Sequence, residues 1–425
     1  MFFLYNLLLS LTLPIWFPLV FLRAKRRAVQ PVWEERWGNY PFKFEKDTRR
    51  IWIHAVSVGE VLAVKPVIRQ LRTLLPTHEI VLSVTTSSGH GTAEGENEKQ
   101  PGLYDHLVYF PFDVARCMLA AMQRVQPDVV AVMETELWMS LFWAAKVFDA
   151  RTMLINGRIS DRSYPRARRI RFWYRALFKD LDRCLMQTEE DVERIEALGA
   201  RGAEVFGNCK FDQALPSEMP NSAAIRLEFG IPSDALVLVI GSTRGAEEEQ
   251  LVLDSVASLA AWKDGRLHVV HAPRHLERVH ELTALVAEKL RLQPGLRSAN
   301  GTGRYVILDT YGELANVYAA ADVVVIGGGF ADLGGQNLIQ PLALGKPVIH
   351  GPHMQNFRSA AASAAAVGAT LVASNAAELT GALNTLLGNP DLRASMGKAA
   401  AELVHRNIGA SKRYAEAIAE AVQQS

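Results

Sequence analysis

Short apolar runs alternate with amphipathic stretches along almost the whole chain, and this alternation constrains the fold more than any other feature. Short apolar runs bounded by turn residues are typical of buried strands, whereas apolar residues spaced three or four apart are typical of helices. The expected strands of the first half are 51–55, 80–84, 107–110, 129–133, 152–155, 184–186 and 204–206. Helical patterns separate most of them, so the sequence predicts an α/β fold with doubly wound sheets.

The same alternation starts again in the second half of the chain. The expected strands there are 237–240, 267–271, 305–308, 323–326, 347–349 and 370–372. An irregular stretch that contains Pro216, Pro220 and Pro232 separates the two series. We therefore expect two Rossmann-like domains that face each other across a cleft, which is a natural place for a ligand. The expected boundaries are 35–210 for the first domain, 211–233 for the linker, 234–405 for the second domain and 406–425 for a terminal helix.

The first 22 residues contain no charged side chain. As a helix this segment would be about 33 Å long, close to the roughly 30 Å of a bilayer's hydrocarbon core. A basic cluster follows it, and by the positive-inside rule this leaves the rest of the chain in the cytoplasm. We expect residues 1–22 to form an uncleaved membrane anchor, tilted or partly interfacial, with a buried core helix as the alternative.

Overall charge gives little indication of a partner, because the formal net charge of the 425 residues is only +1. Nucleic acid is therefore not an expected partner, and basic recognition has to be local. The stretch 166–175 is such a place: it carries five arginines around Phe172, Trp173 and Tyr174. A basic, aromatic helix of this kind suits anionic headgroups at a membrane surface, although a plain solvated helix remains the alternative.

Glu60 lies where the first strand of the chain gives way to a helix. In α/β sheets the carboxyl ends of the strands are where ligands bind. A carboxylate at this point suggests a general base rather than a phosphate cradle. The competing interpretation is helix capping, because an acidic residue in a first turn complements the helix dipole.

Further carboxylates follow a later strand of the same half. Glu134 and Glu136 come just after the run 129–133, and Asn156 and Arg158 follow the next expected strand. A buried pair of acids with shifted pKa values could do acid–base chemistry, orient a substrate hydroxyl or cap the next helix.

The densest cluster of candidate binding residues lies between 312 and 357. Three glycines, 327–329, follow the expected strand 323–326 and would let backbone amides approach a ligand. A helix starting near Asn337 would point its amide groups at the same ligand, which favours an anionic group there. Gln340 would lie one turn below. Arg274 follows the strand 267–271 and could contact phosphate. The three glutamates 247–249 are expected to be only a solvated helix start.

Taken together, these motifs are similar to those of 3-deoxy-D-manno-octulosonic acid (Kdo) transferases, which are lipid A-modifying glycosyltransferases. The motifs occur in the family's order and include IHAVSVGE, ETELW, NGRIS, PRH, GGQN and GKPVxxGPHMxNF. The resemblance covers nearly the whole chain. It implies a GT-B fold, with acceptor binding in the first domain and nucleotide-sugar binding in the second.

The resemblance also implies substrates and residue roles. The implied donor is CMP-Kdo, with no separate cofactor and no metal, and the implied acceptor is a tetraacylated lipid A precursor (lipid IVA) at the bacterial inner membrane. Glu60 matches the family's general base. Positions that the resemblance places around CMP are Pro273, Arg274, Gly312, Glu313, Leu314 and Asn337. Gly328 and Gly329 of the glycine loop and Gln340 complete the expected nucleotide-sugar site.

The chain departs from the family's usual pattern at three positions. Gln340 stands where Glu is frequent, and Gln336 and Arg244 stand where His is frequent. A neutral amide accepts hydrogen bonds from ribose hydroxyls more weakly than a carboxylate does, so these changes bear on donor contacts. The alternatives are a membrane-associated GT-B enzyme that uses a UDP-sugar, an NAD-dependent oxidoreductase and a non-catalytic nucleotide sensor. The oxidoreductase would need GxGxxG after a first strand, and neither half has it there.

Overall fold

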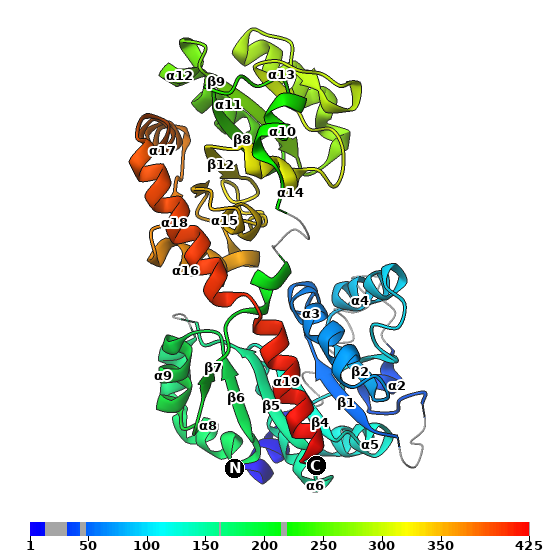
Figure 1. Cartoon of the computed structure of the whole chain (residues 1–425). Helices are drawn as coiled ribbons and strands as arrows, with labels where there is room; N and C mark the ends of the chain where they lie inside the picture. The colour runs from blue at the N-terminus through cyan, green and yellow to red at the C-terminus, as the bar shows by residue number, and fades with distance from the viewer. Residues whose placement is uncertain (13–31, 43–47, 161–162, 214–218, 425) are drawn as a thin grey trace. The chain divides into compact units, whose positions relative to one another are not determined.

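The computed structural model describes residues 1–12, 32–42, 48–160, 163–213 and 219–424. The chain divides into two compact units, Met1–Gln213 together with Asn407–Ser425, and Ala214–Arg406. Each unit contains one seven-stranded sheet in which all strand pairs are parallel (Figure 1). Two Rossmann-like domains are therefore present, as the alternating pattern predicted.

The sheet of the first unit has the order β3-β2-β1-β4-β5-β6-β7. Its strands are β1 (Arg50–His54), β2 (Glu79–Val84), β3 (His106–Tyr109), β4 (Val129–Met133), β5 (Arg151–Gly157), β6 (Arg183–Met186) and β7 (Glu204–Val205). Its main helices are α3 (Val58–Leu74), α4 (Ser87–Lys99), α5 (Ala115–Val125), α6 (Met139–Val147), α9 (Glu189–Leu198) and α19 (Ala410–Gln423). Shorter ones are α2 (Trp33–Arg36), α7 (Tyr164–Arg169) and α8 (Arg171–Leu177).

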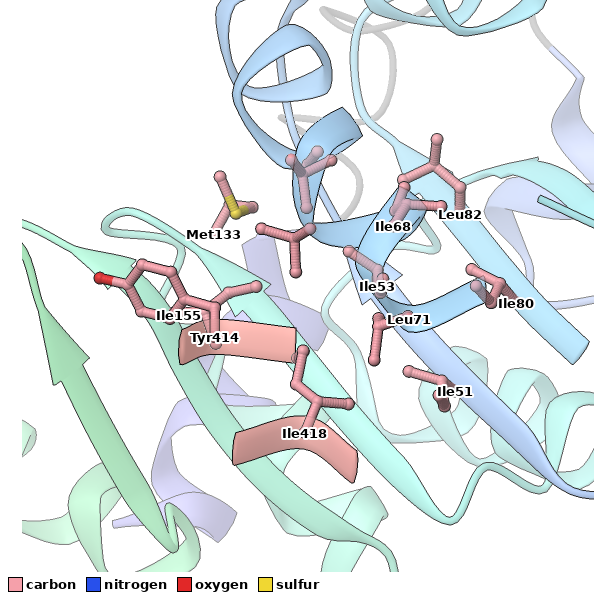
Figure 2. Packing of buried hydrophobic residues seen from close by; sticks show 14 of the residues in the cluster. Ile51, Ile53, Ile68, Leu71, Ile80, Leu82, Met133, Ile155, Tyr414 and Ile418 are labelled. Atoms are coloured by element: carbon pink, nitrogen blue, oxygen red, sulfur yellow. The ribbon is translucent and has the colours of Figure 1, made fainter. Parts of the chain in front are cut away.

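Both faces of this sheet are covered by apolar side chains. Ile51 and Ile53 of β1 belong to one buried cluster and Trp52, between them, belongs to the other, as expected from the alternation of side chains along a strand. Figure 2 shows Ile51 and Ile53 near Leu71 of α3 and Ile418 of α19. The last helix is therefore part of the core of the first unit, and Figure 1 shows α19 (red) alongside α3.

The sheet of the second unit has the order β10-β11-β9-β8-β12-β13-β14. Its strands are β8 (Leu236–Thr243), β9 (Leu267–Pro273), β10 (Gly295–Leu296), β11 (Tyr305–Ile307), β12 (Val323–Ile326), β13 (Val348–His350) and β14 (Thr370–Val372). Its helices include α10 (Ser222–Glu228), α11 (Ala246–Ser258), α13 (Val279–Leu290), α14 (Leu314–Val317), α15 (Ile339–Ala343), α16 (Arg358–Ala366), α17 (Ala376–Gly388) and α18 (Pro390–Asn407). The two-residue strand β10 was not predicted, because it has no apolar run of its own.

Candidate active site

Glu60 lies in the first turn of α3, directly after β1. Its side chain folds back over the turn: the Val56 amide donates to Glu60 Oε2 at 2.8 Å, and the Ser57 hydroxyl donates to Oε1 at 3.3 Å. This arrangement is close to a capping box, in which the third helical residue reaches back to an amide before the helix. The carboxyl group therefore stabilises the helix start, and it does so at the strand edge where ligands bind in such folds.

Burial is the main influence on the pKa of Glu60. The residue is only 9% exposed. Burial, the neighbouring charge of Glu134 and, more weakly, that of Glu136 raise the pKa of Glu60 to about 8, against the lowering effect of the Val56 and Ser57 hydrogen bonds. Burial likewise raises the pKa of Glu136 to about 7. Burial is the largest of the causes that act on Glu60.

A lysine that the sequence reasoning missed pairs with this carboxylate cluster. Lys210 Nζ lies 2.9 Å from Glu134 Oε1, and both side chains are largely buried. The amide of Cys209 donates to Asn156 Oδ1 at 3.2 Å, which fixes the lysine's segment against β5. In the sequence, Lys210 is notable only because it comes shortly after the strand that begins at Glu204. Its pairing with Glu134 could not be predicted, because the two residues are 76 positions apart.

Two residues at this edge have a left-handed backbone that side chains rarely adopt. Glu134 has φ of 54° and Asn156 has φ of 51°. They follow Met133 and Ile155, which are paired in the register of β4 and β5, so the two lie at adjacent strand ends. Such strain costs about 1–3 kcal/mol per residue and concentrates at functional sites. This part of the ETELW and NGRIS motifs is therefore held in an energetically costly shape beside Glu60.

In the second unit, the candidate donor residues lie along the carboxyl edge of one sheet. Gly312, Glu313 and Leu314 follow β11, Pro273 ends β9 with Arg274 next, and Gly328 and Gly329 follow β12. Strands β11, β9, β8 and β12 are consecutive neighbours, so these residues share one edge. The side chain of Arg274 is exposed, and its amide donates to Thr243 O at 2.9 Å. The structure thus brings these predicted residues to the same edge.

The glycine loop after β12 differs from expectation in one respect. We predicted that its amides would approach a ligand, but those of Gly328 and Phe330 donate to the carboxylate of Glu248 at 2.7 and 3.2 Å. A nearby protein carboxylate therefore already satisfies these donors. Gly327 is needed for a different reason: an added Cβ would lie 2.5 Å from Thr243 Cα, so β8 and the loop touch backbone to backbone.

The helix expected near Asn337 begins two residues later and is short. It is α15, five residues long, and Asn337 Oδ1 accepts a hydrogen bond from the Ile339 amide at 2.9 Å. The N-cap position is Leu338, and the Asn337 side chain forms a local turn just before it, so one of the amides expected to face an anion is already satisfied. Gln340 lies within α15 and is half-buried.

The arginine-rich stretch is not the single helix that was expected. It forms two short helices, α7 and α8, which meet at Ile170. Its five arginines are all exposed: Arg166, Arg168, Arg169, Arg171 and Arg175. Ile170 and Phe172 are exposed with them, at 45% and 62%. The stretch therefore presents both positive charge and apolar surface to the surroundings.

Of the expected anchor, residues 13–22 lie outside the described residues. Residues 2–12 are helical, and two of their polar side chains reach into the first unit. Tyr5 donates to Asp113 at 2.7 Å, and Asn6 Oδ1 accepts from the Ala115 amide at 2.7 Å. The opposite face exposes apolar side chains, namely Phe3, Leu4, Leu7, Leu8 and Leu11. Among the described residues, no helix combines the length and the apolar character needed to cross a membrane.

In the part of the chain that the structure describes, no three His, Cys, Asp or Glu side chains are grouped so that they could hold a metal ion. Cys117, Cys184 and Cys209 are free thiols, and all three are buried.

The fold and the sequence of this chain are both similar to those of known proteins. The architecture is that of GT-B proteins: MurG from Acinetobacter baumannii aligns over 89% of this chain and 100% of its own, with a TM-score of 0.57 and 13% sequence identity. A 3-deoxy-D-manno-octulosonic-acid transferase (kdotransferase) family profile matches residues 32–213.

Curated relatives extend this match to nearly the whole chain. The 3-deoxy-D-manno-octulosonic acid transferase of Bordetella pertussis is 34% identical over 87% of this chain and 86% of its own length. That of Haemophilus influenzae is 30% identical over 89% of this chain and 88% of its own. The chain belongs to the 3-deoxy-D-manno-octulosonic acid transferase family, and it is a glycosyltransferase.

Proposed function

We propose that the protein transfers Kdo from CMP-Kdo to the glucosamine disaccharide of a lipid A precursor, lipid IVA, with inversion at the anomeric carbon. A hydroxyl of the disaccharide attacks the anomeric carbon of Kdo, the bond to the CMP phosphate breaks, and Glu60 takes the hydroxyl proton. The observation that carries this proposal is the buried Glu60 carboxyl group at the carboxyl edge of the first sheet. A pKa of about 8 makes its ionised form a stronger base than an ordinary glutamate.

The second unit supplies the groups for the donor in this proposal. Arg274 can place positive charge next to the CMP phosphate and stabilise the charge that builds up as CMP leaves. Gly312, Glu313 and Leu314 lie at the neighbouring strand end, where the nucleoside would bind. The donor class is tested by supplying CMP-Kdo or UDP-sugars to the full-length protein with lipid IVA. Release of CMP that depends on lipid IVA supports the proposal, and release of UDP alone contradicts it.

The acid–base role makes a prediction for pH dependence. The pKa of Glu60 is raised, so the fraction able to accept a proton grows as pH rises through about 8. We expect kcat/KM to increase with pH along a limb centred near that value, because kcat/KM reports groups of the free enzyme. In Glu134→Gln this limb should move to lower pH, since a repelling charge is removed and Lys210 loses its partner. If the limb stays at the same pH in Glu134→Gln, the ionisation of this carboxylate cluster does not control the rate.

We also propose that the protein is attached to the bacterial inner membrane, with both domains on the cytoplasmic side. The helical segment 2–12 is held on the first unit by Tyr5 and Asn6, so its apolar face can lie in the headgroup region of the bilayer. Tyr5 packs 6.2 Å from Trp173 of α8 between ring centroids, so the exposed arginines belong to the same part of the unit. They would meet anionic headgroups there.

Replacing the five arginines of α7 and α8 with Gln tests the electrostatic part of this attachment. Each basic residue near an anionic surface contributes on the order of 1 kcal/mol, so binding to phosphatidylglycerol-containing vesicles should fall at least about tenfold. Wild-type binding should weaken with salt. The matched control is Lys398→Gln with Lys412→Gln, two exposed lysines elsewhere in the chain. If both variants sediment with vesicles equally well, the arginines have no role in membrane binding.

A further inference from the structure

The first turn of α11 buries two of its three consecutive glutamates. Glu247 is exposed, whereas Glu248 and Glu249 are 1% and 0% exposed. The expectation of a solvated helix start is therefore right for Glu247 alone. Burying a carboxylate is costly unless hydrogen bonds or a cation compensate it, so the contacts of these two side chains show what they are for.

Glu248 is satisfied by backbone amides from two different loops. The Arg244 amide, in the loop after β8, donates to Oε2 at 2.6 Å. The amides of Gly328 and Phe330, in the glycine loop after β12, donate to Oε2 at 2.7 Å and to Oε1 at 3.2 Å. One carboxylate thus connects the start of α11 to the glycine loop, 80 positions further along the chain.

Glu249 makes a two-pronged contact with a third loop. Arg278 Nε and Nη2 donate to its two carboxylate oxygens at 3.0 and 2.7 Å. Arg278 ends the short 3-10 helix Leu276–Arg278, which follows Pro273 and Arg274 almost directly. Paired, planar contacts of this kind fix orientation as well as position. Glu249 therefore holds the segment that carries Arg274.

We propose that Glu248 and Glu249 are positioning residues of the donor site, which together hold the loops after β8, β9 and β12 in the shape that binds the nucleotide. This inference rests on the proposed function, because these loops carry the predicted donor residues Arg274, Gly328 and Gly329. The two carboxylates do not touch the ligand themselves. The Gly328 and Phe330 amides therefore serve the shape of the glycine loop, because both donate to Glu248.

Substituting Glu248 with Gln tests the proposal with almost no change of shape. Gln has one acceptor oxygen, so at least one loop amide would face an NH₂ group instead of a carboxylate oxygen. We expect the Kd for CMP and the KM for CMP-Kdo to rise about tenfold with kcat nearly unchanged, because lost ground-state binding appears in KM. Glu247→Gln, one position earlier and exposed, is the matched control and should behave as wild type.

Glu249→Gln and Arg278→Gln provide a second, independent measurement. Each should raise KM for CMP-Kdo, and the double variant should lose less than the sum of the two, since both remove one contact. Titration with CMP separates the possible failures. If wild type binds no CMP, the proposed donor is wrong. If wild type binds CMP and Glu248→Gln binds it equally well with an unchanged KM, the positioning role is wrong.

Discussion

Replacing Glu60 with Gln should reduce kcat by about 10²–10⁴-fold, the usual contribution of a positioned general base, while binding of CMP stays as in wild type. Gln keeps an oxygen that can accept the Val56 amide, so the helix start is preserved. It cannot take a proton from the acceptor hydroxyl. Steady-state rates with CMP-Kdo and lipid IVA, together with CMP titration, measure both effects.

The same substitution should stabilise the protein at alkaline pH. The pKa of Glu60 is raised in the folded state from 4.5 to about 8. Its contribution to stability is therefore fully present below pH 4.5 and is lost as pH rises through 8. Gln does not titrate, so the Tm of Glu60→Gln should exceed that of wild type by a few degrees at pH 9 and by less at pH 6. A slow variant with this Tm profile is folded, and its lost rate is chemical.

Full activity of Glu60→Gln would contradict the role of Glu60 as general base. If Glu60→Gln folds, binds CMP and transfers Kdo at close to the wild-type rate, the carboxyl group serves only the helix start. Ser57→Ala is a useful companion, because it removes only the weaker 3.3 Å contact to the same carboxyl group. It should lower the rate far less than Glu60→Gln does.

Replacing Gly351 with Ala should abolish donor binding by displacing the glycine loop. Gly351 follows β13, and an added Cβ would lie 2.1 Å from the carbonyl carbon and oxygen of Gly329 and 2.3 Å from the Phe330 amide nitrogen. These are backbone atoms, so no side chain can turn away to make room. We expect kcat/KM for CMP-Kdo to fall by at least about 10²-fold, because misplacement of about 1 Å can have that effect.

The control for this variant is another glycine in the same unit. Gly381 lies inside α17, and an added Cβ would have no heavy atom within 4 Å. Gly381→Ala should keep full activity and gain about 0.5–1 kcal/mol of stability, because alanine suits a helix interior better than glycine does. If Gly351→Ala is folded and binds CMP as tightly as wild type, the contact between the two loops does not shape the donor site.

The fold was largely predictable because both sheets are parallel and buried on both faces. Such strands appear as short apolar runs, and the expected strands 129–133, 323–326 and 370–372 match β4, β12 and β14. The position of Glu60 in the helix start that follows β1 was predicted from the same pattern. The packing of the last helix on the first unit could not be predicted in this way. It depends on contacts of Tyr414 and Ile418 with core residues that lie 200 or more positions earlier in the chain.

The parts of the site that escaped prediction depend on contacts between distant segments. The pairing of Lys210 with Glu134 and the burial of Glu248 join residues 76 and 80 positions apart. Periodicity describes one segment at a time, so it made the glutamates of α11 look like a solvated helix start. The start of α15 was misplaced by two residues for a local reason: the Asn337 side chain accepts from the Ile339 amide in a turn that precedes the helix.

Mass spectrometry of the lipid product is the decisive test of Kdo transfer by this protein. The full-length protein is incubated with CMP-Kdo and lipid IVA, and the acceptor is followed over time. We expect that lipid IVA gains one or more Kdo residues as CMP is released, and that the gain is lost when Glu60→Gln replaces wild type. Unmodified lipid IVA in the presence of CMP-Kdo, or modification only when a UDP-sugar is supplied, would contradict it.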